Sequence, residues 1–141
     1  MRYPLFSLPL VALLGCASPM RSAGDALSAL SATASTAEPA LEAEYKAQQD
    51  QCLASLADLA KAHECVAQVR TSWRPVRDGY RAFRHAWLAA DAALRAAEAA
   101  EAMGQQVDMG KILALVTAAL DAAAAYRDLV NAAPKGNEVA K

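Results

Sequence analysis

Residues 66–94, VAQVRTSWRPVRDGYRAFRHAWLAADAAL, decide the fold. Large apolar residues recur there at seven-residue intervals, at Val66, Trp73, Tyr80, Trp87 and Leu94. A second apolar set, Val69, Val76 and Phe83, follows three residues after the first members, and the seven-residue spacing extends upstream through Tyr45, Cys52 and Leu59. Residues three, four and seven apart share one face of an α-helix, so the pattern predicts helices packed as in a coiled coil or a bundle.

Breaking and capping residues divide this helical pattern. Thr71-Ser72 before Pro75 indicates either a new helix with proline in its first turn or a kink in a continuous helix. Met103-Gly104 ends the alanine-rich stretch, Asp108 can cap the next helix, and Pro134 stops it. One face of that last helix is apolar, formed by Ile112, Leu115, Val116, Ala119, Ala123, Tyr126 and Val130.

The composition agrees with a single helical domain. The chain has 141 residues, 55% of them hydrophobic but only 6% aromatic, and alanine supplies much of the apolar count. Alanine is the strongest helix former but fills little core volume, so we expect an all-α fold: a small bundle of about three long helices with coiled-coil-like packing. We place the helical domain at residues 39–133 and a C-terminal tail at 134–141. The formal net charge of −1 gives no reason to expect a nucleic-acid partner.

The N-terminus carries an export pattern. Arg2 precedes the apolar run PLFSLPLVALL at residues 4–14, which is too short to span a bilayer, and Leu13-Leu14-Gly15-Cys16 closes it. This quartet resembles the lipobox of bacterial lipoproteins. The resemblance implies that residues 1–15 are a signal peptide, that Cys16 carries lipid, and that the chain is held on a membrane by that lipid. The residue after the cysteine is Ala17 rather than Asp, which in that family favours the outer membrane, facing the periplasm. The alternative is a plain signal peptide or a short uncleaved anchor.

The stretch after the cysteine predicts a flexible tether. Residues 16–38 are rich in Ser, Ala and Thr and show no sustained apolar stripe. A coil of this length would give the folded part a typical reach of about 25 Å from the bilayer.

Two cysteines remain, Cys52 and Cys65. An oxidising periplasm favours a disulfide between them, but on one straight helix they would lie about 20 Å apart, and a disulfide tolerates only about 7 Å between Cα atoms. Ser55-Leu56-Ala57-Asp58 fits a helix-start pattern, so we favour a helical hairpin closed by this pair over a free or intermolecular pair.

Arginines gather beside the aromatic stripe. At about 100° per residue, five of them fall within an arc of about 80°. We call this set the arginine edge: Arg70, Arg74, Arg77, Arg81 and Arg84. The arginines can lie over Trp and Tyr rings, as Arg77 over Trp73 and Arg84 over Tyr80, with Asp78 as an ion-pair partner. They can also bind an anionic partner, because the guanidinium fork matches carboxylate and phosphate.

No catalytic motif is present in the sequence. The chain lacks a G-x-S-x-G elbow, an H-E-x-x-H pair and a phosphate-binding glycine loop, and its only near-neutral acid–base candidates are His63 and His85. Metal binding by these histidines with Cys52 and Cys65 is conceivable by residue type, but no close-spaced thiolate pair supports it. We therefore expect no enzymatic activity, no metal and no cofactor.

These features predict a membrane-anchored envelope lipoprotein with a structural or binding role. The arginine edge would contact an anionic envelope component, either a protein, the cell wall or a lipid phosphate. The alternative is a phage-related lipoprotein, either a spanin-like lysis subunit of the outer membrane or a superinfection blocker. Small size, lipobox and helical periodicity resemble these proteins in outline.

Overall fold

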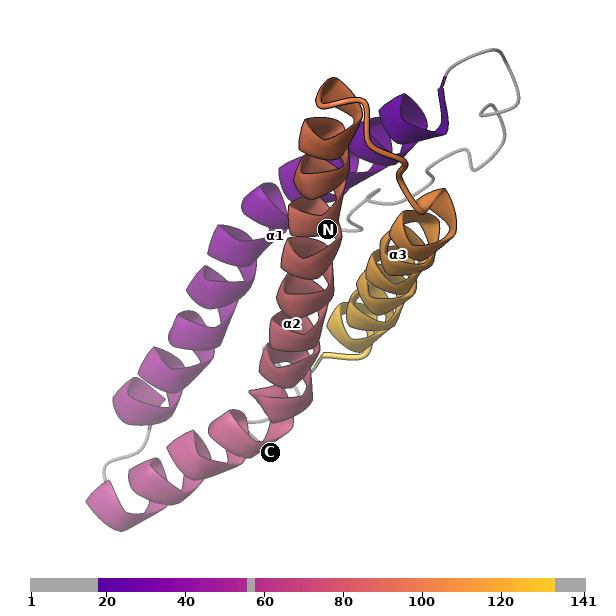
Figure 1. Ribbon diagram of the computed structural model, residues 1–141. Helices are drawn as coiled ribbons and strands as arrows, with labels where there is room; N and C mark the ends of the chain where they lie inside the picture. The colour runs from indigo at the N-terminus through magenta and orange to yellow at the C-terminus, as the bar shows by residue number, and fades with distance from the viewer. Residues whose placement is uncertain (1–17, 56–57, 134–141) are drawn as a thin grey trace.

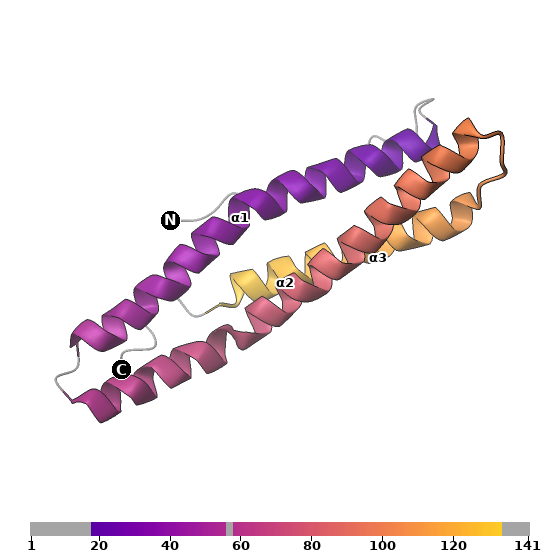
Figure 2. The same ribbon diagram turned by 60° about the vertical axis from the view of Figure 1, so that its left-hand side comes forward.

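The computed structural model describes residues 18–55 and 58–133. It contains helices α1 (Pro19–Ser55), α2 (Leu59–Ala102) and α3 (Met109–Asn131), and these ranges hold no strand. The predicted all-α bundle of three long helices is confirmed. α1 and α2 form a long antiparallel hairpin, and α3 runs back beside the C-terminal part of α2 (Figure 1). The tip of the hairpin extends beyond α3 (Figure 2).

Short capping motifs set the helix ends. α1 ends at Ser55 and α2 begins at Leu59, with the Asp58 carboxylate accepting a hydrogen bond from the Ala60 amide at 2.9 Å. The predicted break between the cysteines is therefore correct, and Asp58 is the N-cap. At the other end Gly104 adopts a φ of 70°, which closes α2, and Asp108 caps α3 as expected.

Pro75 lies inside α2, so the helix is continuous and the kinked alternative is the correct one. α1 likewise contains an internal proline, Pro39. Both helices are bent rather than straight (Figure 2), as expected where a proline removes one backbone hydrogen bond and crowds the preceding turn.

The predicted tether is wrong for residues 19–38, and so is the start of the helical domain at residue 39. This stretch is the first half of α1, where Ala23, Leu27 and Leu30 are buried. Their spacing of three and four residues is a narrow apolar stripe that the surrounding Ser and Thr residues obscure. Packing against α2, rather than intrinsic propensity, stabilises the helix here. Gly24, for example, lies close to Leu94, whose Cδ2 would be 3.6 Å from an added Cβ.

The core runs along the hairpin and under α3. Trp73 and Val69 are its largest fully buried side chains. α3 contributes a buried stripe to the same core: Ile112, Val116, Ala119 and Tyr126. By length and composition alone α3 could cross a membrane, with a mean hydropathy of 1.4 in its most apolar window. The predicted signal peptide, the predicted lipidation site Cys16 and the predicted tail at residues 134–141 lie outside the described residues.

Candidate functional site

Three aromatic side chains of α2 each donate a hydrogen bond to α1. The indole Nε1 of Trp73 donates to Gln48 Oε1 at 2.8 Å, and the Tyr80 hydroxyl donates to Glu38 Oε2 at 2.6 Å. The Nε1 of Trp87 donates to the Leu27 carbonyl oxygen at 3.0 Å. These aromatics are seven residues apart, so the hydrogen bonds recur along one face of α2 and fix its rotation about its own axis.

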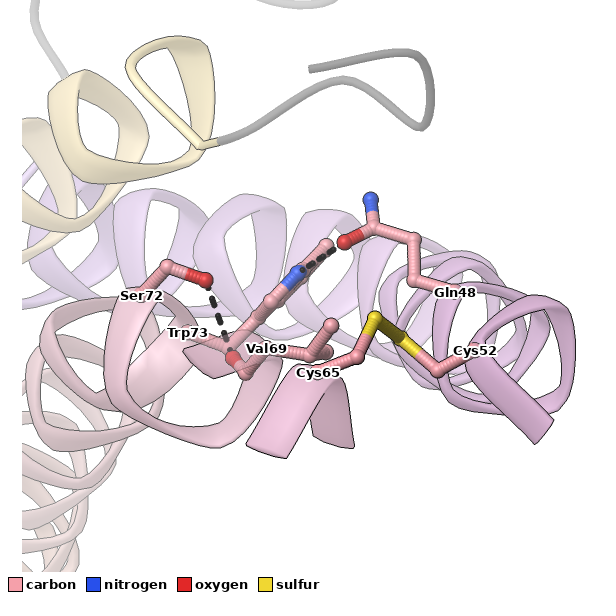
Figure 3. Close-up of a disulfide and its surroundings, with 6 residues drawn as sticks. All are labelled: Gln48, Cys52, Cys65, Val69, Ser72 and Trp73. Carbon is pink, nitrogen blue, oxygen red and sulfur yellow. Dashed lines mark hydrogen bonds between the residues drawn. A yellow bond between two sulfur atoms is a disulfide. The ribbon is translucent and has the colours of Figure 1, made fainter. Parts of the chain in front are cut away.

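A disulfide closes the tip of the hairpin. Cys52 of α1 and Cys65 of α2 are bonded, with their Cα atoms 5.7 Å apart. Figure 3 shows the bond beside the Trp73–Gln48 hydrogen bond. The predicted hairpin and its pairing are therefore present in the structure. The bond leaves neither sulfur as a free thiolate ligand, and the described residues contain no group of three or more His, Cys, Asp and Glu side chains that could hold a metal ion.

Fixing the rotation of α2 leaves the whole arginine edge facing solvent. All five arginines are exposed, and the continuity of α2 through Pro75 keeps Arg70 in line with the other four. Asp78 is the acidic residue among them. Its carboxylate lies 3.6 Å from Arg74 Nε and 3.5 Å from Arg81 Nη1, as the sequence predicted. Both pairs are solvated, with arginine side chains 76% and 73% exposed, so each contributes little to stability.

One predicted ring contact is wrong. The guanidinium of Arg77 lies over Tyr45 of α1, 5.7 Å from the ring centroid, and not over Trp73. Trp73 is 2% exposed, so it faces the interior and stacks at a tilt with Tyr45, with 5.7 Å between the ring centroids. Tyr45 therefore contacts both the buried Trp73 and the exposed Arg77. Arg84 is close enough to Tyr80 for its charge to lower the pKa of that hydroxyl, although other effects outweigh it.

A polar cluster beneath the arginine edge escaped prediction. Burial, the hydrogen bond to Glu38 and the charge of that carboxylate raise the pKa of Tyr80 to about 12. Burial and the neighbouring Tyr80 and Glu38 likewise raise the pKa of Tyr126, on α3, to about 12. The tyrosine ring centroids are 5.5 Å apart. The sequence places Tyr80 and Tyr126 on apolar helix faces but does not predict their contact, and the tether predicted at residues 16–38 hides Glu38.

A close approach of α3 to α2 completes this cluster. A Cβ at Gly79 would lie 2.5 Å from Leu129 Cδ1, so the glycine makes room for that side chain. Tyr126 also stacks on Phe83, with 6.1 Å between ring centroids and 1° between ring planes. All three helices therefore meet at Tyr80, behind the middle of the arginine edge.

The two histidines are exposed positions on α2. Neither belongs to the cluster formed by Glu38, Tyr80 and Tyr126, and the absence of enzymatic activity stays a prediction. No known protein family, curated protein or solved structure matches this chain.

Proposed function

We propose that this chain is a lipid-anchored envelope protein that acts by binding, and that the arginine edge contacts an anionic component of the envelope. The observation that carries the proposal is the exposed row of five guanidinium groups, opposed within the row only by Asp78. Guanidinium forks form paired, charge-assisted hydrogen bonds with carboxylate and phosphate, so a row of them suits an anionic partner.

The disulfide supports a compartment outside the cytoplasm. A bond between Cys52 and Cys65 persists in an oxidising environment such as the periplasm, and cytosolic thiols are kept reduced. The export pattern at residues 1–16 supports the same location, with Cys16 as the lipidated residue and the outer membrane as the destination. The two signals are independent, because one lies in the leader and the other in the folded hairpin.

The hydrogen bonds between α1 and α2 support a binding role for the arginine edge. Trp73, Tyr80 and Trp87 donate to acceptors on α1, so these hydrogen bonds hold α2 against α1 without using the exposed arginine side chains. A rigid helix that carries unburied charges is suited to present those charges to a partner.

Cell fractionation tests the proposal. The wild type should enter the membrane fraction and incorporate labelled fatty acid, whereas Cys16→Ser should remain an unprocessed precursor without label. In the lipidated protein, glutamate at Arg77, Arg81 and Arg84 should abolish salt-sensitive retention on isolated envelopes. Normal processing and labelling of Cys16→Ser would overturn the anchor, and unchanged retention of the glutamate variant would overturn the binding surface.

A further inference from the structure

The arginine edge is remote from the end of the bundle at which the described chain begins. Because α1 and α2 are antiparallel, the start of α1 at Pro19 and the end of α2 at Ala102 lie at the same end (Figures 1 and 2). At about 1.5 Å per residue, Arg84 lies about 27 Å and Arg70 about 48 Å along α2 from Ala102. The disulfide-closed tip lies at the opposite end.

The position of Cys16 in the sequence sets which end faces a membrane, and this step rests on the lipid anchor of the proposed function. Three residue steps separate Cys16 from Pro19, the first residue of α1. Such a segment spans at most about 11 Å even when fully extended. The end of the bundle that contains Pro19 must therefore stay next to the bilayer.

That end also has exposed apolar side chains, as does the opposite tip with Leu53 and Leu59, so the position of Cys16 and not apolar exposure sets which end faces the bilayer. At the end that contains Pro19, Met103 is 67% exposed, and Leu113 and Leu115 in the first two turns of α3 are 44% and 37% exposed. Leu113 and Leu115 are about 200° apart around the helix, on either side of the buried Ile112 and Val116. In the end-on orientation, the bundle meets the bilayer with the end that contains Pro19 and Met103.

In this orientation the arginine edge is out of reach of the lipid headgroups. The Debye length is about 8 Å at physiological ionic strength, several times shorter than the distance to Arg84. The row itself extends about 21 Å from Arg70 to Arg84, with an arginine at every third or fourth residue. Regularly spaced charges along a line match a partner whose own charges repeat along a chain.

The surroundings of the row favour a polymer over a folded protein. Protein interfaces are usually centred on a large apolar or aromatic residue that inserts into the partner. In the part of the chain that the structure describes, the exposed large apolar residue in line with the row is Leu88, which lies one turn beyond Arg84 at the end of the row; none falls within residues 70–84, and Trp73 is buried. We propose that the arginine edge binds an extended, carboxylate-bearing polymer of the cell envelope, tens of ångströms from the anchoring bilayer, and not the headgroups of that bilayer.

Binding of poly-L-glutamate to the full-length lipidated protein in neutral vesicles tests the proposal. The polymer should bind at low salt and more weakly at physiological salt, and should bind far more tightly than free glutamate at equal carboxylate concentration. Glutamate at Arg77, Arg81 and Arg84 should weaken polymer binding at least about tenfold. A control with the same charge change, glutamate at the exposed Arg21, Lys61 and Lys111, should retain it.

A depth measurement tests the orientation. A fluorophore on Met103→Cys should be quenched by a quencher attached to lipid, and the same fluorophore on Arg81→Cys should not. Quenching at position 81, or displacement of the polymer by anionic vesicles, would assign the arginine edge to headgroups and overturn the inference. Equal competition by free glutamate would show a single-anion site and would also overturn it. Failure of the wild type to stay with the vesicles would instead contradict the lipid anchor, which is a separate result.

Discussion

The indole Nε1 of Trp73 on α2 donates a 2.8 Å hydrogen bond to Oε1 of Gln48 on α1, and both side chains are buried. Gln48→Ala should leave the indole N–H without this acceptor and open a small cavity, which costs about 2–3 kcal/mol of unfolding free energy. Denaturant unfolding of the purified protein measures the loss.

The companion variant Trp73→Phe separates the hydrogen bond from the packing. It removes the donor, so Gln48→Ala should cost less in the Trp73→Phe background than in the wild type. Equal costs in the two backgrounds would show that the hydrogen bond contributes nothing.

The disulfide stabilises the part of the hairpin that α3 does not reach. Replacing Cys52 and Cys65 together with alanine should lower the unfolding free energy by about 3 kcal/mol, since the bond closes a short loop in the unfolded chain. A reducing agent should lower the stability of the wild type similarly and leave the double variant unchanged. Sensitivity of the double variant to the reductant would contradict the assignment of the effect to this bond.

The raised tyrosine pKa values make the bundle sensitive to alkali. Both Tyr80 and Tyr126 have a folded-state pKa of about 12, above the ordinary value of 10.0. A group whose pKa is raised by folding favours the folded state while it is protonated, so its contribution is complete below pH 10 and is lost as the pH rises from 10 towards 12. Tyrosinate absorbance should show two late-titrating residues, and unfolding midpoints should fall across the same range.

Glu38→Gln provides the control for this titration. It keeps a hydrogen-bond acceptor but removes the negative charge, so the pKa of Tyr80 should move down towards its ordinary value. An unchanged Tyr80 titration in this variant would show that the carboxylate does not act on the hydroxyl.

The same substitution at two glycines should have opposite effects. Gly104 has a φ of 70°, where a side chain is strained, so Gly104→Ala should cost about 1 kcal/mol of unfolding free energy. Gly24 lies within α1 and an added Cβ meets only ordinary contact with Leu94 at 3.6 Å, so Gly24→Ala should gain up to about 1 kcal/mol. Thermal unfolding of the two variants checks the signs, and a stabilised Gly104→Ala would contradict the capping role.

The sequence predicted the features that depend on local periodicity. The seven-residue spacing around Trp73 placed α2, and Asp108 was correctly expected to cap α3. The Ser55–Asp58 pattern located the break between α1 and α2, although the capping residue is Asp58 and not Ser55, which ends α1. The arginine edge followed from the same periodicity, because angles around a helix depend only on residue number. These predictions needed no knowledge of which helix packs on which.

Features that depend on packing between helices were not predictable from spacing. The first half of α1 has a composition typical of a linker, and its helix is stabilised by burying Leu27 and Leu30 against α2. Misplacing that half also hid Glu38, and with it the shifted pKa of Tyr80. The partner of Arg77 was missed for the same reason, because Tyr45 comes from the neighbouring helix.

Conservative and reversing substitutions separate binding from packing at the arginine edge. Lysine at Arg77, Arg81 and Arg84 keeps the charge and much of the aliphatic stem but loses the planar fork. If the fork grips carboxylates, these changes should weaken retention on purified cell wall while leaving the melting temperature nearly unchanged. Glutamate at the same positions should abolish retention, also with little loss of stability, since the guanidinium groups are exposed and Asp78 forms only solvated pairs.

Glutamate at Arg21, Lys61 and Lys111 should affect neither retention nor the melting temperature strongly. Thermal unfolding and cell-wall retention, each at low and physiological salt, give the comparison. If the glutamate variant at the arginine edge unfolds while the control variant stays folded, these arginines stabilise the bundle, which would contradict their role as a binding surface.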